Sequence, residues 1–148
     1  MRSEAMKKFD FLLGEWSLEY RIPKSSLANA GSDAGTGTFT RALDDRYVFL
    51  DYSTQTGSGA HGVFAWDANL GKYRYWWFEN SGSFLSATCD FVADGVLAMN
   101  WHDSLLVQTF AKDGDDRVVL RMYTAAAHGG HELVLEVIFT RRLSKGTT

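Results

Sequence analysis

Short runs of alternating apolar and polar residues recur about every 10–12 positions from residue 16 onward. In the first of them, Trp16, Leu18, Tyr20 and Ile22 have one parity, and polar residues fill the positions between. A period of two places the apolar side chains on one face of a strand. Further runs occupy 37–43, 47–54, 61–67, 72–79, 84–91, 96–102, 105–112, 117–125 and 131–142. This pattern predicts an all-β protein.

The segments between these runs are short and rich in Gly, Asp, Asn and Ser, which is typical of hairpin turns. The longest is 24–35, a polar, glycine-containing segment that we expect to be a loop. Strands joined by hairpins form an antiparallel meander, and closing the meander removes its exposed edges. We therefore predict an up-and-down barrel of about 8–10 strands. The 148 residues show no linker, so we expect one domain over 1–148.

A short helix is expected over 3–13, before the first strand. Ser3 is its candidate N-terminal cap, and Met6, Phe9 and Leu13 share one face at helical spacing. This helix would close one end of the barrel.

The junction between helix and strand resembles the calycin superfamily, which includes the lipocalins, fatty-acid-binding proteins and avidins. The resemblance starts with the FxxLxGxW pattern at Phe9, Leu12, Gly14 and Trp16. In that superfamily, the Trp packs across the barrel end against a basic residue of the last strand. The resemblance therefore implies a structural barrel end made of Gly14, Trp16 and either Arg141 or Arg142.

Most of the chain also resembles a bacterial lipocalin-like family of unknown function. The matching hairpin runs from Gly62 to Asp67 and on through Asn69, Gly71, Lys72 and Tyr73. These motifs are structural, and fold alone does not fix function.

An aromatic wall is the strongest indication of a binding site. Strand 72–79 carries aromatic residues on both faces, so one face lines the barrel and the other is exposed or covered by a partner chain. Barrels of about eight strands leave room for one small ligand. The predicted ligand-binding residues are Tyr20, Arg41, Phe49, Tyr73, Tyr75 and Trp77.

Arg41 shares its parity with Phe39 and leaves two interpretations open. If that face is inward, the guanidinium pairs with an interior acid such as Asp51 or Glu79, or with the acidic head of a ligand. If the threonines at 36, 38 and 40 face inward, Arg41 is solvated.

We expect the barrel to bind a small, mainly apolar ligand. One alternative is a haem-binding protein or an enzyme that uses the pocket, with His102 or His131 as the haem ligand. The glycine-alternating first strand of related haem barrels is absent, and no other cofactor is predicted. A second alternative is a barrel filled by its own side chains that acts as an interaction module or homodimer.

The remaining composition argues against several other functions. The net charge of −3 disfavours nucleic acid and anionic membranes as partners, and no apolar run is long enough to cross a membrane. A lone cysteine, Cys89, and the lack of a recognisable secretory signal predict a cytoplasmic location. His128 and His131 alone do not make a metal site, and no catalytic motif is recognisable, so neither a metal nor catalytic residues are predicted.

Overall fold

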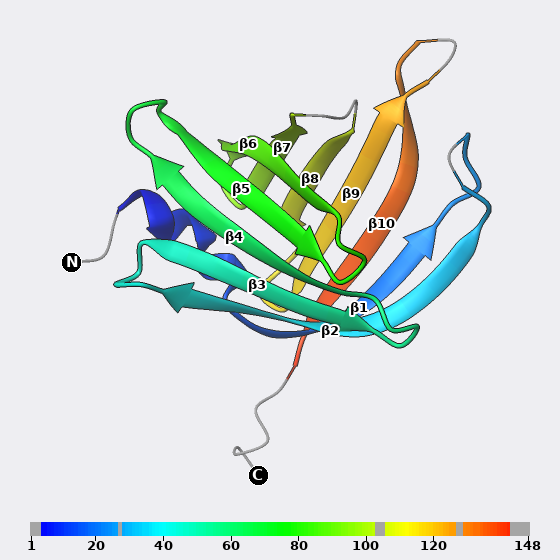
Figure 1. The fold of residues 1–148 in the computed structure, drawn as a ribbon, viewed down its shortest axis with the longest axis horizontal. Coiled ribbons are helices and arrows are strands. Elements are labelled where there is room, and N and C mark those ends of the chain that lie inside the picture. Colours follow the sequence, from blue (N-terminus) through cyan, green and yellow to red (C-terminus); the bar gives the residue numbers. More distant parts are fainter. Residues whose placement is uncertain (1–3, 27, 103–105, 127–128, 143–148) are drawn as a thin grey trace.

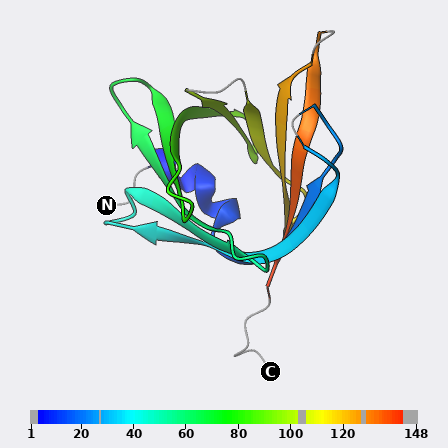
Figure 2. The ribbon, with the colours of Figure 1, turned by 45° about the vertical axis from the view of Figure 1, so that its right-hand side comes forward.

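A computed structural model describes residues 4–26, 28–102, 106–126 and 129–142, and these form a closed antiparallel barrel. The ten strands are β1 (Gly14–Ile22), β2 (Gly31–Ala42), β3 (Tyr47–Thr54), β4 (Gly59–Asp67), β5 (Lys72–Glu79), β6 (Phe84–Ala93), β7 (Val96–Trp101), β8 (Val107–Lys112), β9 (Arg117–Ala125) and β10 (His131–Arg141). Each strand pairs with its neighbours in the chain, and β1 pairs with β10 to complete the ring (Figures 1 and 2). The predicted up-and-down barrel is confirmed.

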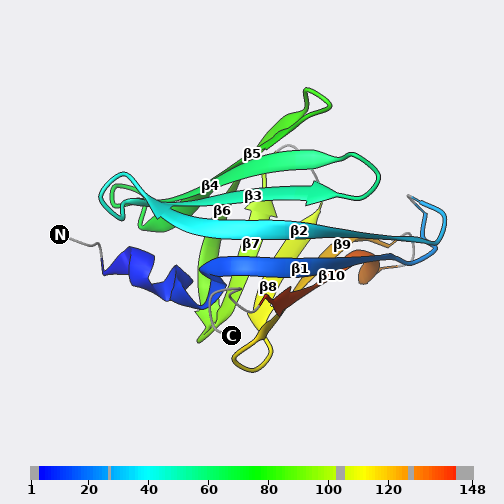
Figure 3. The ribbon, with the colours of Figure 1, turned by 90° about the horizontal axis from the view of Figure 1, so that it is seen from below.

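The N-terminal helix, η1, is a 3-10 helix over Ala5–Leu12 that lies at one end of the barrel (Figure 3). Its buried residues are Met6, Phe9 and Leu12. The prediction that Leu13 completes this face is wrong. A 3-10 helix has three residues per turn, so the residue that shares a face with Met6 and Phe9 is Leu12. The proposed cap, Ser3, lies outside the described residues. Within the described residues, no helix is long and apolar enough to span a membrane.

The prediction of a loop over 24–35 was too long. Strand β2 begins at Gly31, because this small, polar segment continues the hairpin ladder and pairs with β1 from Gly31 opposite Ile22 to Phe39 opposite Gly14. The connection lies at the end of the barrel away from η1, as does the β3–β4 turn (Figure 3).

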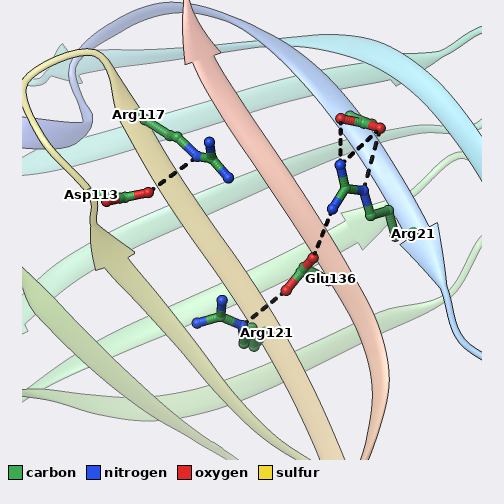
Figure 4. A network of polar contacts seen from close by, with 6 residues as sticks. Arg21, Asp113, Arg117, Arg121 and Glu136 are labelled. Atoms are coloured by element: carbon green, nitrogen blue, oxygen red, sulfur yellow. Dashed lines mark hydrogen bonds and ion pairs between the residues drawn. The ribbon is translucent and has the colours of Figure 1, made fainter.

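One rung of the ladder shows which side chains face outward. Glu136 on β10 stands opposite Arg21 on β1 and Arg121 on β9, and it makes ion pairs of 3.6 Å and 3.0 Å with them (Figure 4). The adjacent rung consists of Tyr20, Val137 and Leu120, which all face the interior. A period of two along each strand thus separates a charged outer surface from an apolar interior.

The half of the interior next to η1 is filled. The ring of Phe9 lies 4.8 Å from Phe64 and 5.1 Å from Tyr73 between ring centroids. The Tyr73 hydroxyl donates a hydrogen bond of 2.6 Å to the carbonyl of Ala5 at the start of the helix. Aromatic packing and this hydrogen bond therefore hold η1 inside the barrel end.

Candidate ligand cavity

The other half of the barrel is hollow. A cavity of about 320 Å³ opens toward the end away from η1, and this volume is within the range of small-molecule sites. Its apolar walls come from the inward face of nearly every strand. The lining residues are Leu18, Tyr20, Leu50, Tyr52, Tyr75, Trp77, Glu79, Leu85, Trp101, Leu106, Gln108, Phe110, Leu120, Met122, Leu135, Val137 and Phe139.

Tyr75 stands at the inner part of this cavity. Its ring lies 4.3 Å from Phe64 and 5.7 Å from Trp101 between centroids. The ring packs on the inner side of Gly62 in β4, where a Cβ atom would come within 2.4 Å of the Tyr75 hydroxyl oxygen. The absence of a side chain at Gly62 therefore makes room for the phenol.

The cavity contains polar groups without protein partners. Among the described residues, the hydroxyls of Tyr20, Tyr52 and Tyr75 make no hydrogen bond, and every fully enclosed polar side-chain atom has a partner. These hydroxyls therefore touch open space. Gln108 is only 4% exposed, and its Oε1 accepts a hydrogen bond of 3.3 Å from Trp101 Nε1. Its amide nitrogen donates no hydrogen bond to a described residue, so its N–H groups are available to a molecule in the cavity.

Aromatic side chains surround the outer part of the cavity. Tyr52 stacks on Trp77 with 5.1 Å between ring centroids, and Tyr20 lies 6.0 Å from Tyr52. The carboxylate of Glu79 accepts hydrogen bonds of 3.1 Å from Trp77 Nε1 and from the hydroxyl of Ser81.

The environment keeps the cavity phenols neutral. Burial raises the pKa of Tyr75 well above its ordinary value. Burial also raises the pKa of Tyr20, with smaller contributions from Tyr52 and from the carboxylate of Asp33. The pKa of Tyr52 is raised mainly by burial and further by the nearby carboxylates of Glu79 and Asp33. At neutral pH these groups therefore act as hydroxyl donors and acceptors.

Three of the six residues predicted to bind ligand line the cavity, namely Tyr20, Tyr75 and Trp77. Tyr73 also points inward, but it lies two residues nearer the helix end of β5. Its hydroxyl donates a hydrogen bond to the carbonyl of Ala5. Phe49 lies on the outer face, 5.2 Å from the ring of His61. Its neighbours Val48 and Leu50 are the inward residues of that strand.

Arg41 also lies outside the cavity. It follows inward Phe39 at the end of β2 that is nearest η1, where its guanidinium pairs with Asp10 of the helix at 2.9 Å. The cavity lining therefore does not include the guanidinium that the sequence analysis placed beside a ligand, because Arg41 lies beyond the last β1–β2 pair, Gly14 opposite Phe39, and reaches η1.

Sequence reasoning missed Tyr52 and Gln108 as cavity residues, and it considered Glu79 only as an interior acid that could pair with Arg41. The alternation in 47–54 places Tyr52 on the face of Leu50 and could have identified it. Glu79 continues the parity of Tyr75 and Trp77. Gln108 had no such indication, because a polar residue in an alternating run is ordinarily assigned to the outside.

The barrel end near η1 has the arrangement that the resemblance implied, with Arg141 as the basic partner. Its guanidinium carbon lies 4.2 Å from the centre of the Trp16 ring. It also donates to the carbonyls of Leu13 at 2.6 Å and Phe11 at 3.2 Å. Gly14 has a φ of +117° next to this guanidinium, whereas the side chain of Arg142 is exposed.

No histidine among the described residues lines the cavity, so a histidine-bound haem does not fit the described lining. His102 is exposed and lies 3.0 Å from the Ser86 hydroxyl, while His131 is exposed at the start of β10. His128 lies outside the described residues. Cys89 is buried, and this burial raises the pKa of its thiol to about 12. The described chain holds no group of three candidate metal ligands.

The outer face of the β5–β6 region is aromatic, as the alternation predicted. Phe78 and Phe84 pair across the two strands, and both are exposed, with Trp76 beside them. A homodimer that covers this face stays a prediction.

Comparisons with solved structures support the fold. Rv2717c from M. tuberculosis has 13% sequence identity, a TM-score of 0.67, and coverage of 97% of this chain and 100% of that chain. The S-type phycobiliprotein lyase CPES from Guillardia theta also has 13% identity, with a TM-score of 0.55 and coverage of 97% and 96%. No protein-family model matches the sequence, and no curated protein matches it.

The closed ten-strand barrel with a helix at one end is a calycin-like fold. The likeness to these structures extends over nearly the whole chain.

Proposed function

We propose that this protein binds a small, mainly apolar ligand inside the open half of the barrel. The observation that carries the proposal is a hollow with apolar walls in which three tyrosine hydroxyls and the Gln108 amide nitrogen have no hydrogen-bond partner among the described residues. An apolar cavity binds apolar molecules readily, and a few convergent polar groups orient them. The alternative of a barrel filled by its own side chains fits only the half of the interior next to η1.

The polar groups define the shape of the ligand. The donors at Gln108 and Tyr75 belong to residues that are 4% and 1% exposed, whereas Tyr20 and Tyr52 are only half-buried. A ligand with one hydrogen-bonding group on an otherwise apolar body satisfies a deep donor without exposing apolar surface to water.

Titration with the uncharged fluorescent probe N-phenyl-1-naphthylamine tests this function. We expect one binding site and a rise in probe fluorescence. Leu120→Trp fills part of the cavity and should weaken binding by about tenfold or more, a loss of about 1.4 kcal/mol. Leu70→Trp in the exposed β4–β5 turn is the matched control and should bind as the wild type does.

Thermal unfolding of both variants verifies that they fold. The proposal is wrong if the wild-type protein does not bind the probe, or if Leu120→Trp and Leu70→Trp bind it equally well.

A further inference from the structure

Glu79 is the charged residue among the described residues that line the cavity. It ends β5 at the open end of the barrel, six positions after Tyr73, which contacts η1. Hydrogen bonds from Trp77 Nε1 and from Ser81 fix both of its carboxylate oxygens. In the described chain, Glu79 makes no ion pair with a basic side chain. Its negative charge is therefore held in place and not neutralised.

The described part of the cavity lining carries no positive charge. Among the described lining residues there is no Lys, Arg or His. Arg41, which the sequence left as a possible interior guanidinium, pairs with Asp10 at the η1 end of the barrel. A carboxylate ligand would lose its hydration next to Glu79 with only neutral donors to replace it. Such desolvation costs several kcal/mol per ion without a paired charge.

The aromatic rings beside Glu79 favour the opposite charge. Trp77 and Tyr52 are stacked 5.1 Å apart, and Tyr20 follows at 6.0 Å. The faces of Trp and Tyr rings attract cations, most strongly where water is partly excluded. Asp33, which stands opposite Tyr20 in the β1–β2 ladder, adds a second carboxylate near these phenols.

We propose that the cavity selects its ligand by charge: it takes an amphipathic amine, with the apolar body inside the barrel and the ammonium group at Glu79 beside Trp77 and Tyr52, and it disfavours carboxylates. This inference rests on the proposed function and narrows its ligand class. It distinguishes this barrel from one that would pair an interior arginine with an acidic ligand.

Three probes with the same ten-carbon chain test the inference, namely decylamine, decan-1-ol and decanoate. Each is titrated at neutral pH and below its micellar concentration by isothermal titration calorimetry. We expect decylammonium to bind about tenfold more tightly than decanoate, with decanol between them, from one ion pair and one cation–π contact. Glu79→Gln should lower decylammonium affinity about fivefold and so bring it close to the affinity for decanol.

Glu15→Gln is the matched control, because it removes the same charge at an exposed position by the helix end of the barrel and should change no affinity. The inference is overturned if decanoate binds as tightly as decylammonium, and the ligand cavity then still stands. If none of the three probes binds, the proposed function fails as well. The wild-type comparison decides the matter even if Glu79→Gln does not fold.

Discussion

Arg141 lies with its guanidinium carbon 4.2 Å from the centre of the Trp16 ring, and the two residues stand opposite each other in the β1–β10 ladder. Trp16 is fully buried, and its Nε1 donates a 2.7 Å hydrogen bond to the carbonyl of Leu12. Arg141 donates to the carbonyls of Phe11 and Leu13. This pair therefore ties the last turn of η1 to the strands that close the barrel.

Arg141→Met should lower the free energy of unfolding by about 2 kcal/mol, because it removes charged donors from two carbonyls and the cation–π contact. Urea denaturation measures the loss. Arg142→Met is the control, with an expected change within about 0.5 kcal/mol, since its side chain is exposed. Equal losses in the two variants would show that Arg141 has no special role.

Gly14→Ala should destabilise the protein by about 1–3 kcal/mol, since φ at this position is +117°. The added Cβ would also lie 2.8 Å from Arg141 Nη1. Gly31→Ala is the control, because a Cβ there meets nothing within 4 Å. Urea denaturation compares them. We expect part of the Gly14→Ala loss to disappear in an Arg141→Met background, and fully additive losses would contradict the crowding.

Arg41→Met should leave the affinity for N-phenyl-1-naphthylamine unchanged and should lower stability by about 0–1 kcal/mol. The reason is that Arg41 makes a partly exposed ion pair with Asp10 of the helix and does not line the cavity. Probe titration and urea denaturation of one preparation give both values. A loss of probe affinity in a stable Arg41→Met variant would show that Arg41 contributes to ligand binding after all.

The buried phenols should make the protein lose stability in alkali. The pKa of Tyr75 is raised in the folded state, so above the unfolded pKa near 10 the unfolded chain binds fewer protons than the native one. Stability is then complete below about pH 10 and falls as pH rises. In Tyr75→Phe, the fall above that pH should be shallower by about 1.4 kcal/mol per pH unit.

Urea denaturation at several pH values between 8 and 11 measures this slope. The effect of Tyr75→Phe on packing is the difference from wild type at pH 8 and serves as the internal reference. Parallel curves for the two proteins would contradict a protonated, buried Tyr75.

Cys89 should not react with a thiol reagent while the protein is folded. It is 2% exposed, and burial raises the pKa of its thiol to about 12, so accessible thiolate is scarce at pH 8. Ellman's reagent should label it slowly in buffer and within seconds in concentrated urea. Rapid labelling of the native protein would show that the barrel wall at β6 opens easily.

The number and pairing of the strands could be predicted from the sequence, because alternation is a local property. Strands 47–54, 72–79 and 117–125 have the predicted bounds. The start of β2 could not be predicted, since Gly31 to Ala34 carry no apolar alternation and become a strand only by pairing with β1. The candidate site was predicted in part, as Tyr20, Tyr75 and Trp77 follow the parity of their strands.

Position along the barrel axis was not accessible to the same reasoning. Tyr73 and Tyr75 have the same parity, yet one binds the helix at Ala5 and the other faces the cavity. Arg41 shares the parity of Phe39 but pairs with Asp10 of η1 and does not line the cavity. The choice of Arg141 over Arg142 depended on register, because only Arg141 stands opposite Trp16.

The sequence by itself determined a closed meander of short strands with an aromatic inner face and a helix before the first strand. The alternation of side chains along each strand is sufficient for that. Only the tertiary structure decided that the barrel is full at one end and hollow at the other. That outcome depends on the total side-chain volume that the ten strands and η1 place at each position along the barrel axis. At one end, Met6, Phe9 and Leu12 of η1 fill the interior.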